Sequence, residues 1–225
     1  MIISSVELIL NFVENTQLRT PARAVFEALG GRATEERRPF EPGANLRDPR
    51  EKMAIKWGYK SFNIVQEDVN DVPKCVSTFI KTIGTVNKVA PIGKISCKTF
   101  RVYWILPVNN YDSKTLETKY RQMFIKDSEI FSNFIDSTIV IDMKYDKWKF
   151  SHQSGAMDVA QLQNQFRVFN IKEGQAGIFF FLATTVTAEQ LEEYSKGNIE
   201  NFLNKAYEIC KTHSDNFEGV MEGIL

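Results

Sequence analysis

Few side chains in this sequence could carry acid–base, nucleophilic or metal chemistry. Among 225 residues there are two histidines, His152 and His213, and three dispersed cysteines, Cys75, Cys97 and Cys210. A zinc site or a serine–histidine–aspartate relay needs an imidazole beside further ligands or a nucleophile. The glycine-rich phosphate-binding, zinc-protease, nucleophile-elbow and calcium-loop motifs are also missing. The sequence therefore predicts no catalytic residue, no metal site and no cofactor, and it favours a protein that is not an enzyme.

The two histidines have different settings. His213 lies on the apolar stripe of a predicted C-terminal helix, where a hydrogen-bonded core or boundary histidine is the common case. His152 follows a predicted strand and precedes a short flexible run, a position where binding residues often lie, although a solvated loop histidine is the alternative. One interpretation therefore places a ligand pocket between a sheet and its helices, lined by Arg101, Tyr103, Trp148 and His152.

Two carboxylates flank a lysine on one predicted strand. Asp142 and Asp146 are spaced to share a strand face with Lys144 between them. Such a pair could serve acid–base or metal chemistry. Pairing with charges on a neighbouring strand explains it more simply, because opposite charges facing each other across strands stabilise a sheet.

The one basic cluster of the chain lies between residues 32 and 52, but interleaved acids nearly cancel its charge. A phosphate-binding surface would show unopposed positive charge, so this segment favours contact with a protein. An inert loop is the alternative for so long a connection. Trp57 and Tyr59 follow it on a predicted turn and are candidate anchors for a partner, since exposed Trp and Tyr are enriched at binding centres; core burial is equally compatible. The predicted partner-binding residues are Arg37, Arg38, Arg47, Trp57 and Tyr59.

The overall composition limits the class of protein. Lys and Arg number 28 against 28 Asp and Glu, so no long-range field attracts nucleic acid, and a nucleic-acid partner is not expected. The dispersed, odd number of cysteines is typical of reduced thiols in the cytoplasm. The first ten residues show neither a basic region nor a cleavage site, and no apolar run reaches membrane length. We expect a cytoplasmic location and no membrane partner.

Apolar periodicity predicts an alternation of strands and helices. Period-two patterns indicate strands over 5–13, 95–108, 138–150, 165–171 and 175–186, with two short strands around a turn at 57–60. The pattern over 138–150 shifts by one residue, which indicates a bulge or a break. Helical spacing and capping residues predict helices from 20 to 30, from 71 to 86, from 112 to 124 and from 199 to 221. Residues 32–52 are predicted as a polar loop.

This order of elements predicts one α+β domain over residues 1–225. Its first six elements match the split βαβ arrangement of ferredoxin-like layers, and helices should pack on one face of a largely antiparallel sheet. The long amphipathic C-terminal helix must dock on that sheet.

The chain also resembles a known protein family. The strand KISCKTFRVYWILPV, the late hairpin and the closing helix NIENFLNKAYEICKTHSDNFEGVMEGIL are similar to a sporadically distributed, functionally uncharacterised family of prokaryotic proteins, over roughly residues 53–225. Members carry an Arg-Tyr pair after a glycine in one strand; here Phe100-Arg101-Val102-Tyr103 lacks the glycine and has a valine between Arg and Tyr. The resemblance implies no activity.

Two functional hypotheses follow from the sequence. The favoured one is a non-catalytic interaction module that binds a protein partner or forms a homodimer through an edge strand. The alternative is an enzyme or small-ligand-binding protein with a pocket between sheet and helices. Titratable residues are few and motifs are absent, and both facts favour the first.

Overall fold

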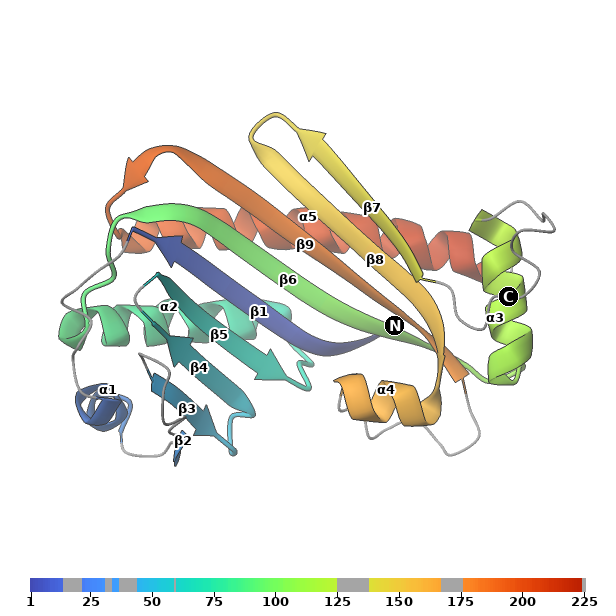
Figure 1. The fold of residues 1–225 in the computed structure, drawn as a ribbon, viewed down its shortest axis with the longest axis horizontal. Helices are drawn as coiled ribbons and strands as arrows, with labels where there is room; N and C mark the ends of the chain where they lie inside the picture. The colour runs from blue at the N-terminus through green and yellow to red at the C-terminus, as the bar shows by residue number, and fades with distance from the viewer. Residues whose placement is uncertain are drawn as a thin grey trace.

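The structure is a computed structural model that describes residues 1–13, 22–30, 34–36, 44–58, 60–124, 138–166 and 176–223. Nine strands and five helices are formed by these residues (Figure 1). The strands are β1 (Ile2–Phe12), β2 (Thr34–Glu36), β3 (Ala44–Asp48), β4 (Met53–Trp57), β5 (Ser61–Glu67), β6 (Ile95–Val108), β7 (Thr138–Tyr145), β8 (Trp148–Asp158) and β9 (Ala176–Glu192). The helices are α1 (Ala22–Ala28), α2 (Val72–Val89), α3 (Ser113–Phe124), α4 (Val159–Phe166) and α5 (Lys196–Glu222).

All nine strands belong to one sheet, in the order β2-β3-β4-β5-β1-β6-β9-β8-β7. Every pair of neighbours is antiparallel. Within this order, β6-β1-β5-β4 is the arrangement of the split βαβ motif. The predicted α+β class, antiparallel sheet and ferredoxin-like first half are confirmed.

The two halves of the chain repeat one pattern of elements. The first half runs β1, α1, β3, β4, β5, α2, and the second runs β6, α3, β7, β8, β9, α5. In the sheet, the order β1-β5-β4-β3 on one side is mirrored by β6-β9-β8-β7 on the other, so a pseudo-two-fold axis passes between β1 and β6. Strand β2 and helix α4 are additions to this pattern. The repeat is one of topology, since no repeated sequence accompanies it.

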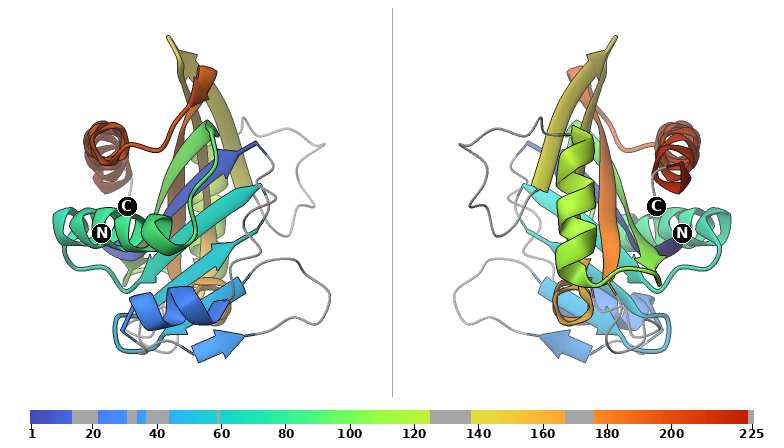
Figure 2. Two further views of the ribbon diagram at one scale, coloured as in Figure 1. Left: turned by 90° about the vertical axis from the view of Figure 1, so that its left-hand side faces the viewer. Right: turned by 90° about the vertical axis from the view of Figure 1, so that its right-hand side faces the viewer.

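Helices α2 and α5 lie side by side on one face of the sheet (Figure 2). Beneath them, alternate strand residues such as Val6, Leu8 and Leu10 of β1 are fully buried. The apolar stripe of α5, from Ile199 to Met221, completes this core, as the sequence predicts. The burial of these apolar side chains is the main favourable contribution to the fold.

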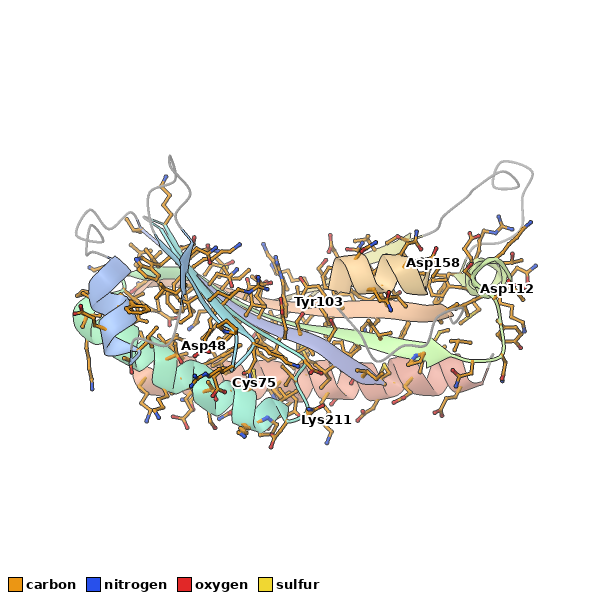
Figure 3. All side chains as sticks on the ribbon, turned by 90° about the horizontal axis from the view of Figure 1, so that it is seen from below. Asp48, Cys75, Tyr103, Asp112, Asp158 and Lys211 are labelled. Carbon is orange, nitrogen blue, oxygen red and sulfur yellow. The ribbon has the colours of Figure 1, made fainter. Side chains whose placement is uncertain are left out.

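Helix α4 lies on the opposite face of the sheet, where Leu162 packs against Ile105 and Phe179 (Figure 3). Helix α3 stands near the end of the sheet, in contact with β8 and β9 (Figure 1). Its buried residues, Leu116 and Tyr120, join the core on the α5 side. The sheet is therefore covered mainly on one face, with a smaller helix on the other.

Local chemistry explains where the helices begin. The side chain of Asp71 accepts a hydrogen bond from the backbone N–H of Lys74 (2.9 Å), and Pro73 occupies the first turn of α2. At the start of α3, the side chain of Asp112 accepts a hydrogen bond from the backbone N–H of Thr115 (2.7 Å). Both starts were predicted from these residues.

Three sequence-based predictions need correction. The loop predicted over residues 32–52 contains β2 and β3, because β4 offers β3 a pairing edge that local polarity does not reveal. The strand predicted over 138–150 is a hairpin, and its shift of pattern marks the two-residue turn between β7 and β8. Residues 165 and 166, predicted as strand, end helix α4, while 167–175 lie outside the described residues.

None of the described helices is long and apolar enough to cross a membrane.

Candidate functional site

The outermost strand on one side of the sheet, β7, exposes large apolar side chains. Val140 is 60% exposed, Ile141 44%, Met143 39% and Tyr145 77%. On its inner side β7 pairs with β8 over all eight residues, and among the described residues no strand pairs with its outer side. A long apolar edge strand of this kind is a template for pairing with another chain.

The backbone of β7 has a defined direction of hydrogen bonding. Tyr145 pairs with Trp148 across the turn Asp146-Lys147, and the positive φ of Asp146 (52°) suits a two-residue hairpin turn. Residues that flank such a turn form a hydrogen-bonded pair, so the odd-numbered residues of β7 bond to β8. The even-numbered residues, including Val140 and Asp142, therefore direct their N–H and C=O groups outward.

The side chains of β7 divide between the two faces of the sheet. Odd-numbered residues such as Met143 face α5, because Met143 lines a groove with residues of that helix. Asp142 and Lys144 face the other way. Neither of these two charged side chains makes a hydrogen bond or ion pair with any described residue. Their charges are available to a partner.

A groove of about 420 Å³ separates α5 from the β7–β8 hairpin and β9. Its floor is apolar, formed by Met143, Phe150 and Leu182, and its α5 wall carries polar side chains that include Lys205 and His213. The groove therefore continues the apolar surface of β7 towards the helix.

Behind this groove, four polar side chains form a connected chain. His213 Nε2 of α5 lies 3.0 Å from His152 Nδ1 of β8, and His152 Nε2 lies 2.7 Å from Ser154 Oγ. The hydroxyl of Tyr120 in α3 lies 2.6 Å from the same Ser154 Oγ. Phe180 and Phe217 pack against the ring of His152, which is 5% exposed.

Burial fixes the protonation of these groups. Burial and the neighbouring His213 lower the pKa of His152 to about 4, and burial also lowers the pKa of His213. Burial raises the pKa of Tyr120 to about 12, so its hydroxyl keeps its proton at neutral pH. Near pH 7 both imidazoles are neutral and each carries one N–H.

The direction of hydrogen-bond donation along these four side chains follows from Tyr120, which lies at one end of them. We assign the Tyr120 hydroxyl as the donor to Ser154 Oγ, its hydrogen-bond partner among the described residues. Ser154 then donates to His152 Nε2, and the N–H at His152 Nδ1 donates to His213 Nε2. The proton of His213 consequently lies on Nδ1, which has no partner among the described residues and is available as a donor at the groove.

Comparisons with known proteins add little to this geometry. No protein-family model matches the chain, and no curated protein matches it. A solved structure that is similar, Methanococcus jannaschii TBP, is 11% identical and covers 92% of this chain and 97% of its own, with a TM-score of 0.29. So low a score carries no argument about fold or function.

The predicted partner-binding residues are only partly described. Arg37, Arg38 and Tyr59 lie outside the described residues. Arg47, on β3, forms an ion pair with Glu67 of β5 (3.5 Å). Trp57 is 4% exposed and belongs to the core, so it is not a surface anchor. Its alternation with Met53 and Ile55 on β4 places all three beneath the helices.

The four residues predicted to line a pocket are not brought together. Arg101 and Tyr103 are odd-numbered residues of β6 on the face opposite α5; in Figure 3, Tyr103 lies across the sheet from Cys75 of α2 and Lys211 of α5. Trp148 and His152 of β8 face α5, where Trp148 stacks on Phe202. The predicted pocket is wrong because successive strand residues point to opposite faces.

Two of these residues have other surroundings than the sequence suggested. His152 does not lie in a loop; it sits within β8 and is 5% exposed. Arg101 forms an ion pair with Glu7 (Nη1 to Oε2, 3.1 Å), and Asn63 Nδ2 donates to the other carboxylate oxygen (2.6 Å).

The sequence pattern did not reveal the contact between His152 and His213. Apolar periodicity correctly placed His213 on the inner side of α5, but it gives no information on which strand residue faces it. Among the described residues, no group of three or more His, Cys, Asp or Glu side chains could hold a metal ion. The features left as candidate sites are the β7 edge with its groove, and His213 within that groove.

Proposed function

We propose that this chain is a non-catalytic interaction module that binds a protein partner, or a second copy of itself, by strand addition at β7. The observation that carries this proposal is the eight-residue edge strand with exposed Val140, Ile141, Met143 and Tyr145. Backbone hydrogen bonds along the outer side would give affinity, and the groove would select side chains of the partner.

The opposite edge of the sheet supports this assignment by contrast. There the described residues of the last strand, β2, are Thr34, Glu35 and Glu36, whose side chains are polar or charged, and charged edge strands limit pairing between molecules. Strand β7 contains no proline and presents apolar side chains on both faces. Without a partner, the exposed edge of β7 would favour aggregation of the protein, whereas the edge of β2 would not.

The proposal includes a cytoplasmic location, which the dispersed cysteines favour. Cys75 and Cys210 are buried free thiols, and burial raises the pKa of each to about 12, which makes them poor nucleophiles. Neither contributes to the proposed interaction surface.

The test blocks the outer edge of β7 without disturbing its inner edge. Asp142→Pro removes an N–H that is directed away from β8, and proline is tolerated at such edge positions. Ile141→Lys places a charge on the apolar surface, and Val220→Lys on α5, where Val220 is 52% exposed, is the matched control.

Two measurements are made on the wild type and these variants: molar mass by light scattering, and binding of proteins from the native lysate. We expect self-association or partner binding by the wild type and Val220→Lys, and its loss in Asp142→Pro and Ile141→Lys with unchanged melting curves. Binding that persists in both edge variants would contradict the proposal.

A second candidate function is the binding of a small anionic ligand in the groove. The observation that favours it is that His213 and Lys205, which pairs with Glu208, line the same groove above an apolar floor. Anilinonaphthalene sulfonate, which joins an apolar ring system to an anion, is a suitable probe. Fluorescence enhancement that is reduced by His213→Phe and by Lys205→Met, but not by Lys211→Met on the exposed side of α5, would support this function. Equal enhancement in all variants would exclude it.

A further inference from the structure

We infer that the partner at β7 is a second copy of this chain, held by an antiparallel pair of β7 strands with Met143 opposite Met143 of the second copy. This inference rests on the proposed function, because it names the partner for the same edge. It requires a two-fold axis perpendicular to the sheet, which joins the two sheets into one and keeps both α5 helices on the same face.

Symmetry limits how the two strands can pair. Residues directly opposite each other in an antiparallel pair point to the same face of the sheet. Even-numbered residues must therefore lie opposite even-numbered ones, and odd opposite odd. Registers centred on Val140, Ile141, Asp142 or Met143 satisfy this condition and keep at least five residues of β7 paired.

The charges of β7 favour the register centred on Met143. In that register Asp142 lies opposite the partner's Lys144, and symmetry forms this pair twice. Ile141 lies opposite the partner's Tyr145 on the α5 side, so the most exposed apolar side chain of the strand gains an apolar neighbour. Each opposite-charge or aromatic–aliphatic pair of this kind contributes roughly 0.2–1 kcal/mol in sheets.

The other three registers lack this complementarity. Centring on Val140 places Asp142 opposite the partner's Thr138, which carries no charge. Centring on Asp142 places that carboxylate opposite its own copy, and like charges directly opposite destabilise a sheet. Centring on Ile141 places Asp142 opposite the partner's Val140 and Lys144 opposite the partner's Thr138, which leaves all four charges of the strand pair without a partner. The spacing of one aspartate and one lysine, two residues apart, is thus self-complementary in one register only.

The backbone agrees with the same register. Asp142 and Lys144 direct their N–H and C=O groups outward, so these two residues can exchange hydrogen bonds with the second copy. Met143 then falls in a non-hydrogen-bonded pair, where opposite Cα atoms lie about 4.5 Å apart. This distance is within the range of about 4.4–6.8 Å that a disulfide bridges.

Cysteine cross-linking tests the register directly. In a Cys97→Ser background, which removes the partly exposed native thiol, Met143→Cys should form an intermolecular disulfide on mild oxidation. Ile141→Cys is the matched control, because the two copies of residue 141 would lie about 13 Å apart along the strands at 3.3 Å per residue. Cross-linking of Ile141→Cys in preference to Met143→Cys would overturn the register.

Charge exchange tests the complementarity. Asp142→Lys should weaken the dimer about tenfold or more by sedimentation equilibrium, because two attractive pairs become repulsive. The double variant Asp142→Lys/Lys144→Asp restores opposite charges in the same register and should return the dissociation constant to within about threefold of the wild type. Failure of the double variant to recover, with folding intact by circular dichroism, would overturn the inference.

The outcomes separate this inference from the proposed function. A dimer that cross-links through Met143→Cys and recovers on charge exchange supports both. A monomer that binds a different protein through β7 overturns the second copy as partner and leaves the interaction module standing. A monomer with no binding dependent on β7 overturns both.

Discussion

His152 Nδ1 of β8 and His213 Nε2 of α5 lie 3.0 Å apart, within a chain of hydrogen bonds that continues through Ser154 to Tyr120. This contact joins the closing helix to the sheet through polar atoms in an otherwise apolar core. Because a buried polar group without a partner destabilises a protein, the four side chains depend on one another. The loss of any one of them should therefore lower the stability of the fold.

The histidine pair should make stability depend on pH. The pKa of His152 is lowered to about 4 in the folded state, against about 6.5 when unfolded, and that of His213 is also lowered. Between these values the unfolded chain binds more protons, so stability is full above about pH 6.5 and is lost as the pH falls towards 4. Urea unfolding at pH 7.5 and pH 4.5 should show a loss of up to about 3 kcal/mol from His152.

The control for this prediction is the double variant His152→Gln/His213→Gln, whose amides can form hydrogen bonds but do not titrate. Its free energy of unfolding should change less between the two pH values than that of the wild type. An identical pH dependence would show that the histidines are not the titrating groups.

Tyr120→Phe should destabilise the fold by about 1 kcal/mol, because Ser154 Oγ loses its buried donor while the ring packing is kept. The matched control is Tyr207→Phe, since the Tyr207 hydroxyl has no hydrogen-bond partner among the described residues; it should change stability by less than about 0.5 kcal/mol. Equal effects of the two substitutions in urea unfolding would argue against the hydrogen-bonded chain.

Substitution by alanine should have opposite effects on the stability of the fold at two glycines. A Cβ on Gly177 of β9 would lie 2.9 Å from Leu162 Cδ1 and 3.2 Å from the backbone oxygen of Leu106, so Gly177→Ala should destabilise by about 1–3 kcal/mol. At Gly219 on α5, nothing lies within 4 Å of the position that a Cβ would take, and Gly219→Ala should stabilise by up to about 1 kcal/mol through helix propensity. Thermal unfolding of both variants checks the signs, and a stabilising Gly177→Ala would show that α4 can move away from the sheet.

Arg101→Met should destabilise by about 1–3 kcal/mol, because the Glu7 carboxylate, 12% exposed, loses its cation. The control is Lys205→Met, whose exposed pair with Glu208 (3.5 Å) should contribute less than about 0.5 kcal/mol. The comparison is made by urea unfolding at low and high salt. Arg101→Met with no more effect than the control would mean that Asn63 alone stabilises the Glu7 carboxylate.

Local sequence pattern was sufficient for most of the elements. Alternation in β1 and β6, the capping residues Asp71 and Asp112, and the apolar stripe of α5 depend on residues close together in the chain. The predictions that failed, a loop where β2 and β3 lie and a strand at residues 165 and 166, concern short segments in which local propensity is weak and neighbouring elements decide.

The candidate site was predicted only in part. The sequence indicated an interaction module that uses an edge strand. It explained Asp142 and Asp146 by pairing with charges on a neighbouring strand, but Asp142 lies opposite Ser151 and Asp146 lies in the turn after β7. It did not show that β7 is the edge, because strand order depends on which segments far apart in the chain become neighbours. It also grouped Arg101 and Tyr103 with Trp148 and His152, although the pleat separates the two pairs onto opposite faces.

The sequence by itself therefore determined the α+β class, the antiparallel character of the sheet and the inner face of α5, since periodicity records which side of an element is buried. Only the tertiary structure decided that His152 meets His213, 61 positions further along the chain, that Trp57 is buried and that β7 lies outermost. These are relations between distant segments, and they arise when the whole chain buries its apolar surface at once.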